Sequence, residues 1–290
     1  MSSSAWSGWR RRVALAGAAV LLGCAPAAEP DPAVLRVSAL PDQAPERVRA
    51  QHERLIEQVC ARAQLRCEWT PVPSYEALVD RIGDGSIDLA YFGAVTFAQA
   101  AHRHRARPLA MRDIDFRFTS VIVVRRDHAA RSLADLRQQA FAFGNRQSTS
   151  GHYMVRQRLQ QQGIDPERHF SSVVHRDTHD ATLRAVADGE VAAGATNASV
   201  FYQRLLAGDA AAGRLRVLWQ TPPYVDYVWG VRGGLSPALR QRLADAFLDL
   251  DVTVPAHRAA LDDEGASGYV PAFAGDFDEV RAIVGAHGRL

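Results

Sequence analysis

The sequence predicts an α/β fold with two α/β lobes joined by two crossing strands. Strand patterns and amphipathic helix patterns alternate along most of the 290 residues, which favours parallel sheets built from βαβ units. Two apolar runs, at 116–125 and 227–231, are interpreted as the crossing strands. Because two crossings imply that one lobe is inserted within the other, we expect lobe 1 to comprise 34–118 and 230–290, and lobe 2 to comprise 119–229.

The N-terminal segment is typical of a bacterial secretion signal. Three arginines at 10–12 precede an apolar run of about ten residues, which is too short to cross a bilayer as a stable helix. We interpret residues 1–23 as a lipoprotein signal peptide and residues 24–33, rich in Ala and Pro, as a tether. The run ends in Leu-Leu-Gly-Cys, which resembles a lipobox, in which Cys24 is acylated and anchors the chain to a membrane. An ordinary cleaved signal with an incidental cysteine is the alternative.

The composition excludes several classes of function. Removing the three arginines of the signal from the 34 basic side chains leaves 31, against 32 acidic ones, so the mature chain lacks the net basic charge expected of a nucleic-acid-binding protein. Every basic side chain is arginine, which excludes lysine Schiff-base chemistry. Cys60 and Cys67 either pair in an oxidising compartment or stay separate and buried. No metal-ligand pattern accompanies them, and we expect neither a metal nor a cofactor.

The elements of lobe 1 are read from short β-branched runs and from apolar positions that recur every three or four residues. The expected strands are 35–40, 67–72 and 88–92, and the expected helices are 46–64, 75–82 and 94–101. Beyond the second crossing, Ser236 and Pro237 are a typical N-cap and first-turn proline for a helix at 238–250. The remaining tail should pack on lobe 1.

The elements of lobe 2 continue the same alternation after the first crossing strand. They are a helical turn at 132–136, a strand at Phe141, a helix ending at Gly163, strands at 170–175, 191–196 and 215–219, and helices at 180–188 and 200–206. We therefore expect a second sheet covered by helices.

The segment 141–154 carries the strongest functional signal. A short apolar strand ends in a glycine, hydroxyl residues follow at Ser148, Thr149 and Ser150, and a helical pattern begins there. The hydroxyls and the unpaired N–H groups of a first helical turn can all point at one anion, and Gly151 lets that anion approach the backbone. The simpler alternative is a serine-rich helix cap.

A second anion signal lies at His179. Thr178 or Asp180 can cap the helix that follows, so that His179 stands at the positive end of its dipole. This helix and the hydroxyl-rich one follow strands of the same expected sheet, and their N-termini should emerge at one edge, where ligands of open α/β sheets bind. Tyr75 and the turn at Gly93 can face the same crevice from lobe 1. The alternative is a surface histidine in a capping region.

Four segments resemble the periplasmic binding proteins for phosphate, phosphite and phosphonate. They are Ser148-Thr-Ser-Gly151, His179-Asp180 before an alanine-rich helix, Asp88-Leu-Ala-Tyr-Phe-Gly93 and Thr221-Pro-Pro-Tyr-Val-Asp-Tyr227. The resemblance extends over about 35–269, and the segments 37–45 and 221–227 are most similar to a branch named for selenate transport. It implies a type II periplasmic binding protein, whose two lobes close on a ligand, in agreement with the crossing strands.

The resemblance also implies roles for individual residues. Those placed at the ligand site are Tyr75, Phe92, Gly93, Ser148, Thr149, Ser150, His179, Asn197 and Asp226. The hydroxyls of 148–150 would hold the oxyanion, His179 would donate to it, and Tyr75 would close over it. Phe92 stands where some phosphonate binders have a tyrosine. An acid that those binders place shortly after Asn197 is absent, which disfavours a ligand with an amine.

Asp226 bears on the choice of oxyanion. A carboxylate beside a bound anion is tolerable if the ligand carries a proton to donate and repulsive if it carries none. Phosphite, phosphonate and phosphate can bring a P–OH group near neutral pH, whereas selenate and sulfate cannot. A carboxylate in the pocket would favour the phosphorus ligands, while the resemblance to the selenate branch favours the alternative of a selenate- or sulfate-type binder.

These features together predict a substrate-binding lipoprotein of an ABC importer. It would be periplasmic and monomeric, with a small oxyanion, a permease and its ATPase, and a membrane reached through Cys24 as its partners. A ligand-sensing module for a membrane kinase would share these features. A serine hydrolase is disfavoured, because Asp180 has poor geometry for orienting His179 and no Gly-x-Ser-x-Gly motif occurs.

Overall fold

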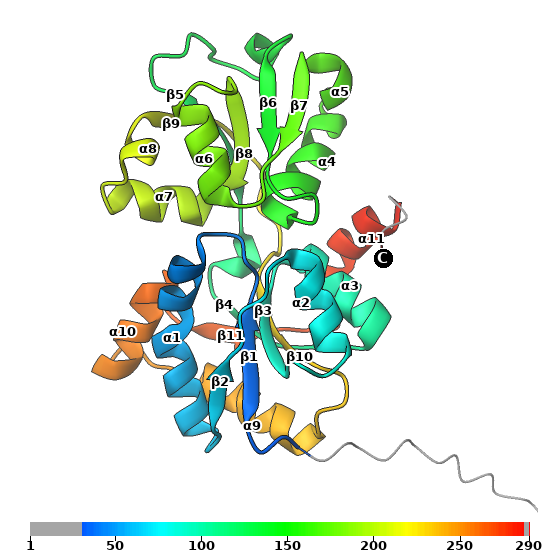
Figure 1. Cartoon of the computed structure of the whole chain (residues 1–290), viewed down its shortest axis with the longest axis vertical. Coiled ribbons are helices and arrows are strands. Elements are labelled where there is room, and N and C mark those ends of the chain that lie inside the picture. The colour runs from blue at the N-terminus through cyan, green and yellow to red at the C-terminus, as the bar shows by residue number, and fades with distance from the viewer. Residues whose placement is uncertain (1–30, 287–289) are drawn as a thin grey trace, which may run out of the picture.

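The computed structural model describes residues 31–286 and 290, which form two α/β lobes stacked along the long axis of the molecule (Figure 1). The first-lobe sheet has the strand order β11 (Tyr269–Pro271), β4 (Arg107–Arg112), β10 (Val228–Val231), β3 (Leu89–Phe92), β1 (Leu35–Ala39), β2 (Cys67–Trp69). The second-lobe sheet has the order β7 (Ser172–His175), β6 (Ala140–Phe143), β8 (Ala193–Asn197), β5 (Ser120–Arg125), β9 (Leu215–Gln220). Signal peptide and acylation site lie outside the described residues, as does most of the tether.

Helices cover both sheets. Those of the first lobe are α1 (Pro45–Arg62), α2 (Tyr75–Gly83), α3 (Ala94–His104), α9 (Pro237–Leu248), α10 (Pro255–Glu264) and α11 (Asp278–Ala286), with short turns η1 (Asp115–Arg117) and η4 (Ala274–Phe277). Those of the second lobe are α4 (Met154–Gln161), α5 (Pro166–His169), α6 (His179–Ala187), α7 (Ala198–Leu206) and α8 (Ala210–Gly213), with turns η2 (Ala134–Leu136) and η3 (Thr149–Tyr153). Among the described residues, no helix is both long and apolar enough to cross a membrane.

Strand β5 shows why the second-lobe sheet is buried on both faces. Its side chains alternate between the two faces, as the period of a strand requires. Val121 and Val123 pack into the cluster beneath α6, whereas Ile122 and Val124 pack into the cluster on the opposite face. The continuous β-branched run that sequence analysis noticed is therefore a central strand.

Both sheets are mixed, whereas sequence analysis expected parallel βαβ sheets. Strands β1, β2 and β3 are parallel, but β10 runs antiparallel to β3 and β4. In the second lobe, β6, β7 and β8 are parallel and β5 is antiparallel to its neighbours. The reason is the connection between the lobes. Strands β5 and β10 each enter a sheet from the side of the cleft, so they run antiparallel to neighbouring strands that end at the cleft. Strands β4 and β11 were not anticipated.

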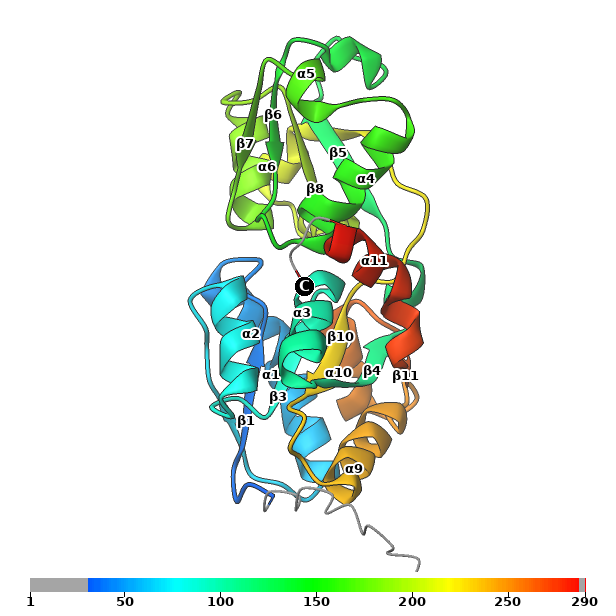
Figure 2. The same cartoon turned by 90° about the vertical axis from the view of Figure 1, so that its right-hand side faces the viewer.

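Two neighbouring segments form the hinge. The chain passes to the second lobe at Phe118 and returns at Tyr224, and these residues exchange backbone hydrogen bonds of 2.8 and 2.9 Å. The chain returns to the first lobe before the predicted boundary between residues 229 and 230, because Val228 and Trp229 already pair with β3 in the first-lobe sheet. Figure 2 shows α11 rising from the first lobe toward the second, where Glu279 pairs with Arg158 at 2.8 Å.

A disulfide joins Cys60 at the end of α1 to Cys67 at the start of β2. Sequence analysis left this pairing open. The bond connects a helix to the edge strand of the first-lobe sheet.

Candidate functional site

The hydroxyl-rich segment forms a helix start directly after β6. The Ser148 hydroxyl accepts a hydrogen bond of 2.9 Å from the Gly151 N–H, as an N-cap does. The first turn, η3, is a single π-helical turn, a feature often found at functional sites. Gly151 packs against Gly144 so closely that an added Cβ would lie 3.0 Å from the Gly144 Cα, so glycine is needed here for loop packing.

His179 is the first residue of α6, which is capped by Thr178 rather than by Asp180. Its Nδ1 accepts the Asn197 N–H at 3.4 Å and lies 3.1 Å from the Thr196 hydroxyl. Because Nδ1 is an acceptor, the neutral ring carries its hydrogen on Nε2. Burial lowers the pKa of His179 and favours this neutral form. The buried Nε2 has no hydrogen-bond partner among the described residues, so it is an available donor.

Asp226 lies in the returning hinge segment. Its N–H donates to the Asp115 carbonyl at 3.1 Å, and its Oδ1 accepts the N–H of Ala94, the first residue of α3, at 3.1 Å. Burial raises the pKa of Asp226 to about 8. Its Oδ2 is buried and without a partner in the described part of the chain. A pKa of about 8 favours the protonated form of Asp226 at neutral pH, in which the side chain can donate a hydrogen bond, whereas the sequence-based prediction treated it as an ionised carboxylate.

The two lobes meet at the hydroxyl-rich helix start at 148–151, which we call the cup. The Thr149 hydroxyl accepts the Val95 N–H at 3.0 Å. Burial raises the pKa of the Tyr75 hydroxyl well above its usual value, and the Ser148 side chain of the second lobe partly offsets that rise. A Cβ added at Gly93 would lie 3.2 Å from the Thr149 hydroxyl. Tyr75 and Gly93 thus face the second lobe, as sequence analysis expected of both.

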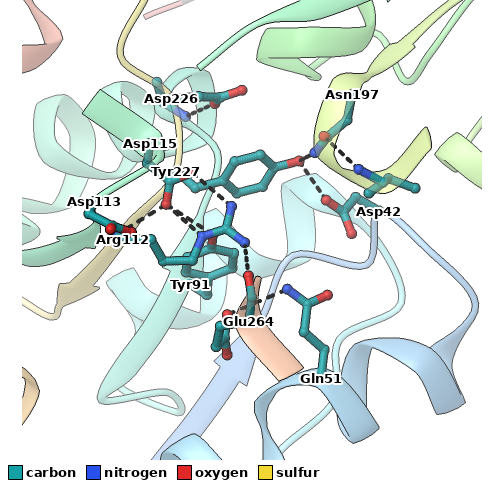
Figure 3. A network of polar contacts seen from close by, with 12 residues as sticks. Asp42, Gln51, Tyr91, Arg112, Asp113, Asp115, Asn197, Asp226, Tyr227 and Glu264 are labelled. Atoms are coloured by element: carbon teal, nitrogen blue, oxygen red, sulfur yellow. Dashed lines mark hydrogen bonds and ion pairs between the residues drawn. The ribbon is translucent and has the colours of Figure 1, made fainter. Parts of the chain in front are cut away.

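Asp42 and Tyr227 border the site, and the sequence-based prediction did not place either of them there. The Tyr227 hydroxyl lies between Asp42 and Asn197 (Figure 3). It donates a hydrogen bond to the Asp42 carboxylate at 2.6 Å and accepts one from the Asn197 amide at 3.0 Å. The Asp42 carboxylate lies 4.0 Å from His179 Nε2, and its carbonyl accepts the His179 N–H at 2.8 Å. Asp42 follows β1 at the edge where α/β sheets bind ligands, a signal that was present in the sequence.

The residues named from sequence differ in how their side chains are engaged. Ser150, His179 and Asp226 each present a buried polar atom without a partner among residues 31–286 and 290. Ser148, Thr149 and Asn197 use their side chains to cap helices or to join the lobes. Other members of the set have different roles: the Phe92 ring packs on Phe97 in the first-lobe core.

A buried charged network lies behind the site in the first lobe (Figure 3). Arg112 pairs with Asp115 at 2.7 Å and donates to the Glu264 carbonyl at 2.7 Å. Its guanidinium stacks over the rings of Tyr91 and Tyr227. Because Arg112 is already paired, its role is to hold Tyr227 and the hinge in place. No cluster of three or more metal-ligating side chains occurs within the described ranges.

The geometry disfavours a hydrolytic triad. In a triad, an acid orients the imidazole through its far nitrogen. Here Nδ1 of His179 faces Thr196 and a backbone N–H, and Asp180 instead pairs with Arg204 and accepts the Ala44 N–H. The arrangement is suited to holding an anion with neutral donors between two lobes.

Solved structures of binding proteins share this architecture. PhnD1 from Prochlorococcus marinus in complex with methylphosphonate matches with a TM-score of 0.84 at 28% identity, covering 90% of this chain and 100% of that chain. A binding protein component of an ABC phosphonate transporter from Pseudomonas aeruginosa matches with a TM-score of 0.79 at 18% identity, covering 87% and 86%. The fold is that of a two-lobed type II periplasmic binding protein.

The sequence comparisons define the family. A family model described as ABC transporter, phosphonate, periplasmic substrate-binding protein matches residues 37–277. The chain belongs to this family. A probable ABC transporter phosphite binding protein, PhnD1 of Prochlorococcus marinus, is 29% identical over 266 residues, which cover 87% of this chain and 89% of the relative. The phosphate-import protein PhnD of Mycolicibacterium smegmatis is 24% identical over 278 residues, covering 88% and 86%.

Proposed function

We propose that this chain captures a small tetrahedral phosphorus oxyanion, of the phosphite or phosphonate type, for an ABC importer. The observation that carries the proposal is that three residues predicted at the site each have a buried polar atom without a hydrogen-bond partner in the described structure: Ser150 Oγ, His179 Nε2 and Asp226 Oδ2. Buried polar groups are normally hydrogen-bonded, and leaving one unpaired costs about 1–3 kcal/mol. A bound oxyanion would satisfy all three at once. The relatives named for phosphite and methylphosphonate support this ligand class.

Two carboxyl groups near the cup give a basis for selectivity. Asp226, protonated at neutral pH, donates to a ligand oxygen, whereas the Asp42 carboxylate accepts a hydrogen bond from a P–OH group. A ligand that is an anion and also bears one hydroxyl matches both groups. Selenate and sulfate bring no proton to Asp42 and would meet an unrelieved like charge. In this proposal Asp42, rather than Asp226, distinguishes protonated phosphorus oxyanions from selenate and sulfate.

Ligand binding stabilises the closed lobes in the proposed mechanism. Ser150 and His179 bind the anion from the second lobe, Asp226 binds it from the hinge, and Tyr75 closes from the first lobe. Only contacts that improve on closure can drive closure. The closed form then delivers the ligand to a membrane permease and its ATPase. We further propose that the mature chain starts at an acylated Cys24, which holds it at a membrane surface.

A thermal-shift panel tests the proposed ligand class. The chain from Ala25 onward, which keeps every described residue, is heated with phosphate, phosphite, methylphosphonate, 2-aminoethylphosphonate, sulfate and selenate. A ligand at about a hundred times its dissociation constant adds roughly 2.7 kcal/mol of stability. We expect phosphite or methylphosphonate to raise the transition most. Stabilisation by selenate alone would overturn the role of Asp42, and the absence of any shift would overturn the oxyanion site.

A further inference from the structure

The connection between α3 and β4 carries an unusual run of basic side chains. Residues 102–107 read His-Arg-His-Arg-Ala-Arg and contain no acid. Arg103, Arg105 and Arg107 are exposed, and within residues 31–286 and 290 none of them has an ion-pair partner. The run therefore presents uncompensated positive charge.

A groove of about 330 Å³ lies beside this run, between α3, the start of β4 and η4. Its basic lining includes His102, Arg105, Arg107 and Arg281, and apolar side chains of α3 and η4 also line it. Arg281 pairs with Asp278 on its own helix. The groove combines cationic and apolar side chains, a combination that suits an amphipathic anionic surface.

An exposed aromatic ring stands at the same edge. The chain after β11 continues alongside β4, where the Ala272 N–H donates to the Leu109 carbonyl at 3.2 Å. The next residue, Phe273, therefore lies near the start of β4, and its side chain is 64% exposed. The nearby Asp276 is occupied, since it accepts the Phe273 N–H at 2.7 Å. Aromatic and basic side chains together are typical of surfaces at the membrane–water interface.

The described chain also begins at this end of the lobe. The Asp31 carboxylate binds the N–H and hydroxyl of Ser236 at 3.1 and 2.7 Å, just before α9. The preceding Gly233 packs against Arg105, whose carbonyl would lie 2.8 Å from an added Cβ. Cys24 precedes Asp31 by seven residues, which span at most about 25 Å when extended. An acyl chain on Cys24 would hold this end of the lobe close to a bilayer.

We call this surface the basal edge and define it by Arg103, Arg105, Arg107 and Phe273. We propose that the basal edge contacts the anionic phospholipid surface of the membrane that anchors the chain. The proposal rests on the proposed acylation of Cys24. Figure 1 shows the start of β1 at the far end of the first lobe from the second lobe. Contact through the basal edge therefore leaves the cleft turned away from the bilayer and open to ligand.

Vesicle co-flotation of the unacylated chain from Ala25 onward tests the surface separately from the anchor. Neutral phosphatidylcholine vesicles are compared with vesicles that contain phosphatidylglycerol, at low and high ionic strength. The test variant is Arg105→Gln/Arg107→Gln. The control is Arg137→Gln/Arg184→Gln, which removes two exposed arginines of the second lobe. Thermal unfolding and the phosphite-induced shift are recorded for each variant, so that loss of folding or of ligand binding is recognised.

We expect binding to anionic vesicles at low salt, loss of that binding at high salt, and a decrease of about 25-fold in the test variant, or about fivefold for each arginine. The control variant should bind as the unchanged chain does, and Phe273→Ser should weaken binding further. Equal binding to neutral and anionic vesicles would overturn the proposal. So would equal binding by the test and control variants, whatever the outcome of the oxyanion panel.

Discussion

The Thr149 hydroxyl accepts a hydrogen bond of 3.0 Å from the Val95 N–H, which joins the second-lobe cup to the first turn of α3. The same turn is bound by Asp226 through the Ala94 N–H. The first two N–H groups of α3 are therefore bound by Asp226 of the hinge and by the Thr149 hydroxyl of the second lobe. In the proposed site, ligand capture and lobe closure would therefore involve adjacent atoms.

Removal of the Tyr75 hydroxyl should weaken closure more than capture. Tyr75→Phe keeps the buried ring but removes the hydroxyl whose pKa the Ser148 side chain of the opposite lobe influences. We expect a loss of about 0.5–1.5 kcal/mol in ligand binding. Small-angle scattering should show less ligand-induced compaction. Tyr202→Phe, on the exposed face of α7, is the control. Unchanged affinity and compaction in Tyr75→Phe would contradict the role.

Ser150 and Ser148 should respond differently to alanine. Ser150→Ala removes an unpaired buried hydroxyl, so the unliganded protein should keep its stability while ligand binding falls by about 1.5–3 kcal/mol. Ser148→Ala also removes an N-cap and should cost about 1 kcal/mol of unfolding free energy. Chemical denaturation with and without phosphite measures both effects. Equal destabilisation of the two unliganded variants would show that Ser150 has an unrecognised structural partner.

Ligand affinity should fall as pH rises above about 8. Because the pKa of Asp226 is raised to about 8, the acid is neutral below that pH and becomes a negative charge beside the ligand above it. Above this pKa, binding should weaken by up to about tenfold per pH unit, since only the protonated form binds well. Asp226→Asn keeps a neutral donor and should lack the part of the decline that Asp226 causes, so that only the loss of the ligand's own P–OH proton remains. Calorimetry from pH 6 to pH 9.5, with the exposed Asp262→Asn as control, decides the point.

Asp42→Asn should shift selectivity toward unprotonated oxyanions. Without the carboxylate near His179, selenate and sulfate no longer face a like charge, and a P–OH group loses its charged acceptor. The ratio of selenate to phosphite affinity should rise by at least about tenfold, equivalent to 1.4 kcal/mol. Competition binding with both anions measures this ratio. An unchanged ratio would place Asp42 outside the selective contacts.

The disulfide should contribute to stability without affecting the ligand. Cys60 and Cys67 close a loop with a sequence separation of 7, for which the chain-entropy relation gives about 2.5 kcal/mol. Cys60→Ala/Cys67→Ala should lower the free energy of unfolding by that order and leave phosphite affinity unchanged. Urea denaturation and calorimetry are the measurements. A large loss of affinity would indicate that the pair also shapes the cleft.

The sequence alone determined the class of fold and predicted much of the second-lobe half of the proposed site. The β-branched run at 119–124 and the hydroxyls at Ser148 and Ser150 are local signals, because strand period and helix capping depend on neighbouring residues. His179 was identified by its place before a helix. The resemblance of separate motifs to one family then connected these signals, and the family match over 37–277 confirmed it.

The tertiary structure decided which polar atoms are available and which are engaged. Thr149 and Asn197 join the lobes or cap helices, and Asp42 borders the site. The sequence did not show this, because their partners Val95 and Tyr227 lie from 30 to 185 residues away in sequence. The protonation of Asp226 was likewise decided by burial, which only the packed lobes create. The antiparallel strands at the hinge have the same origin, since their direction depends on how one lobe is inserted into the other.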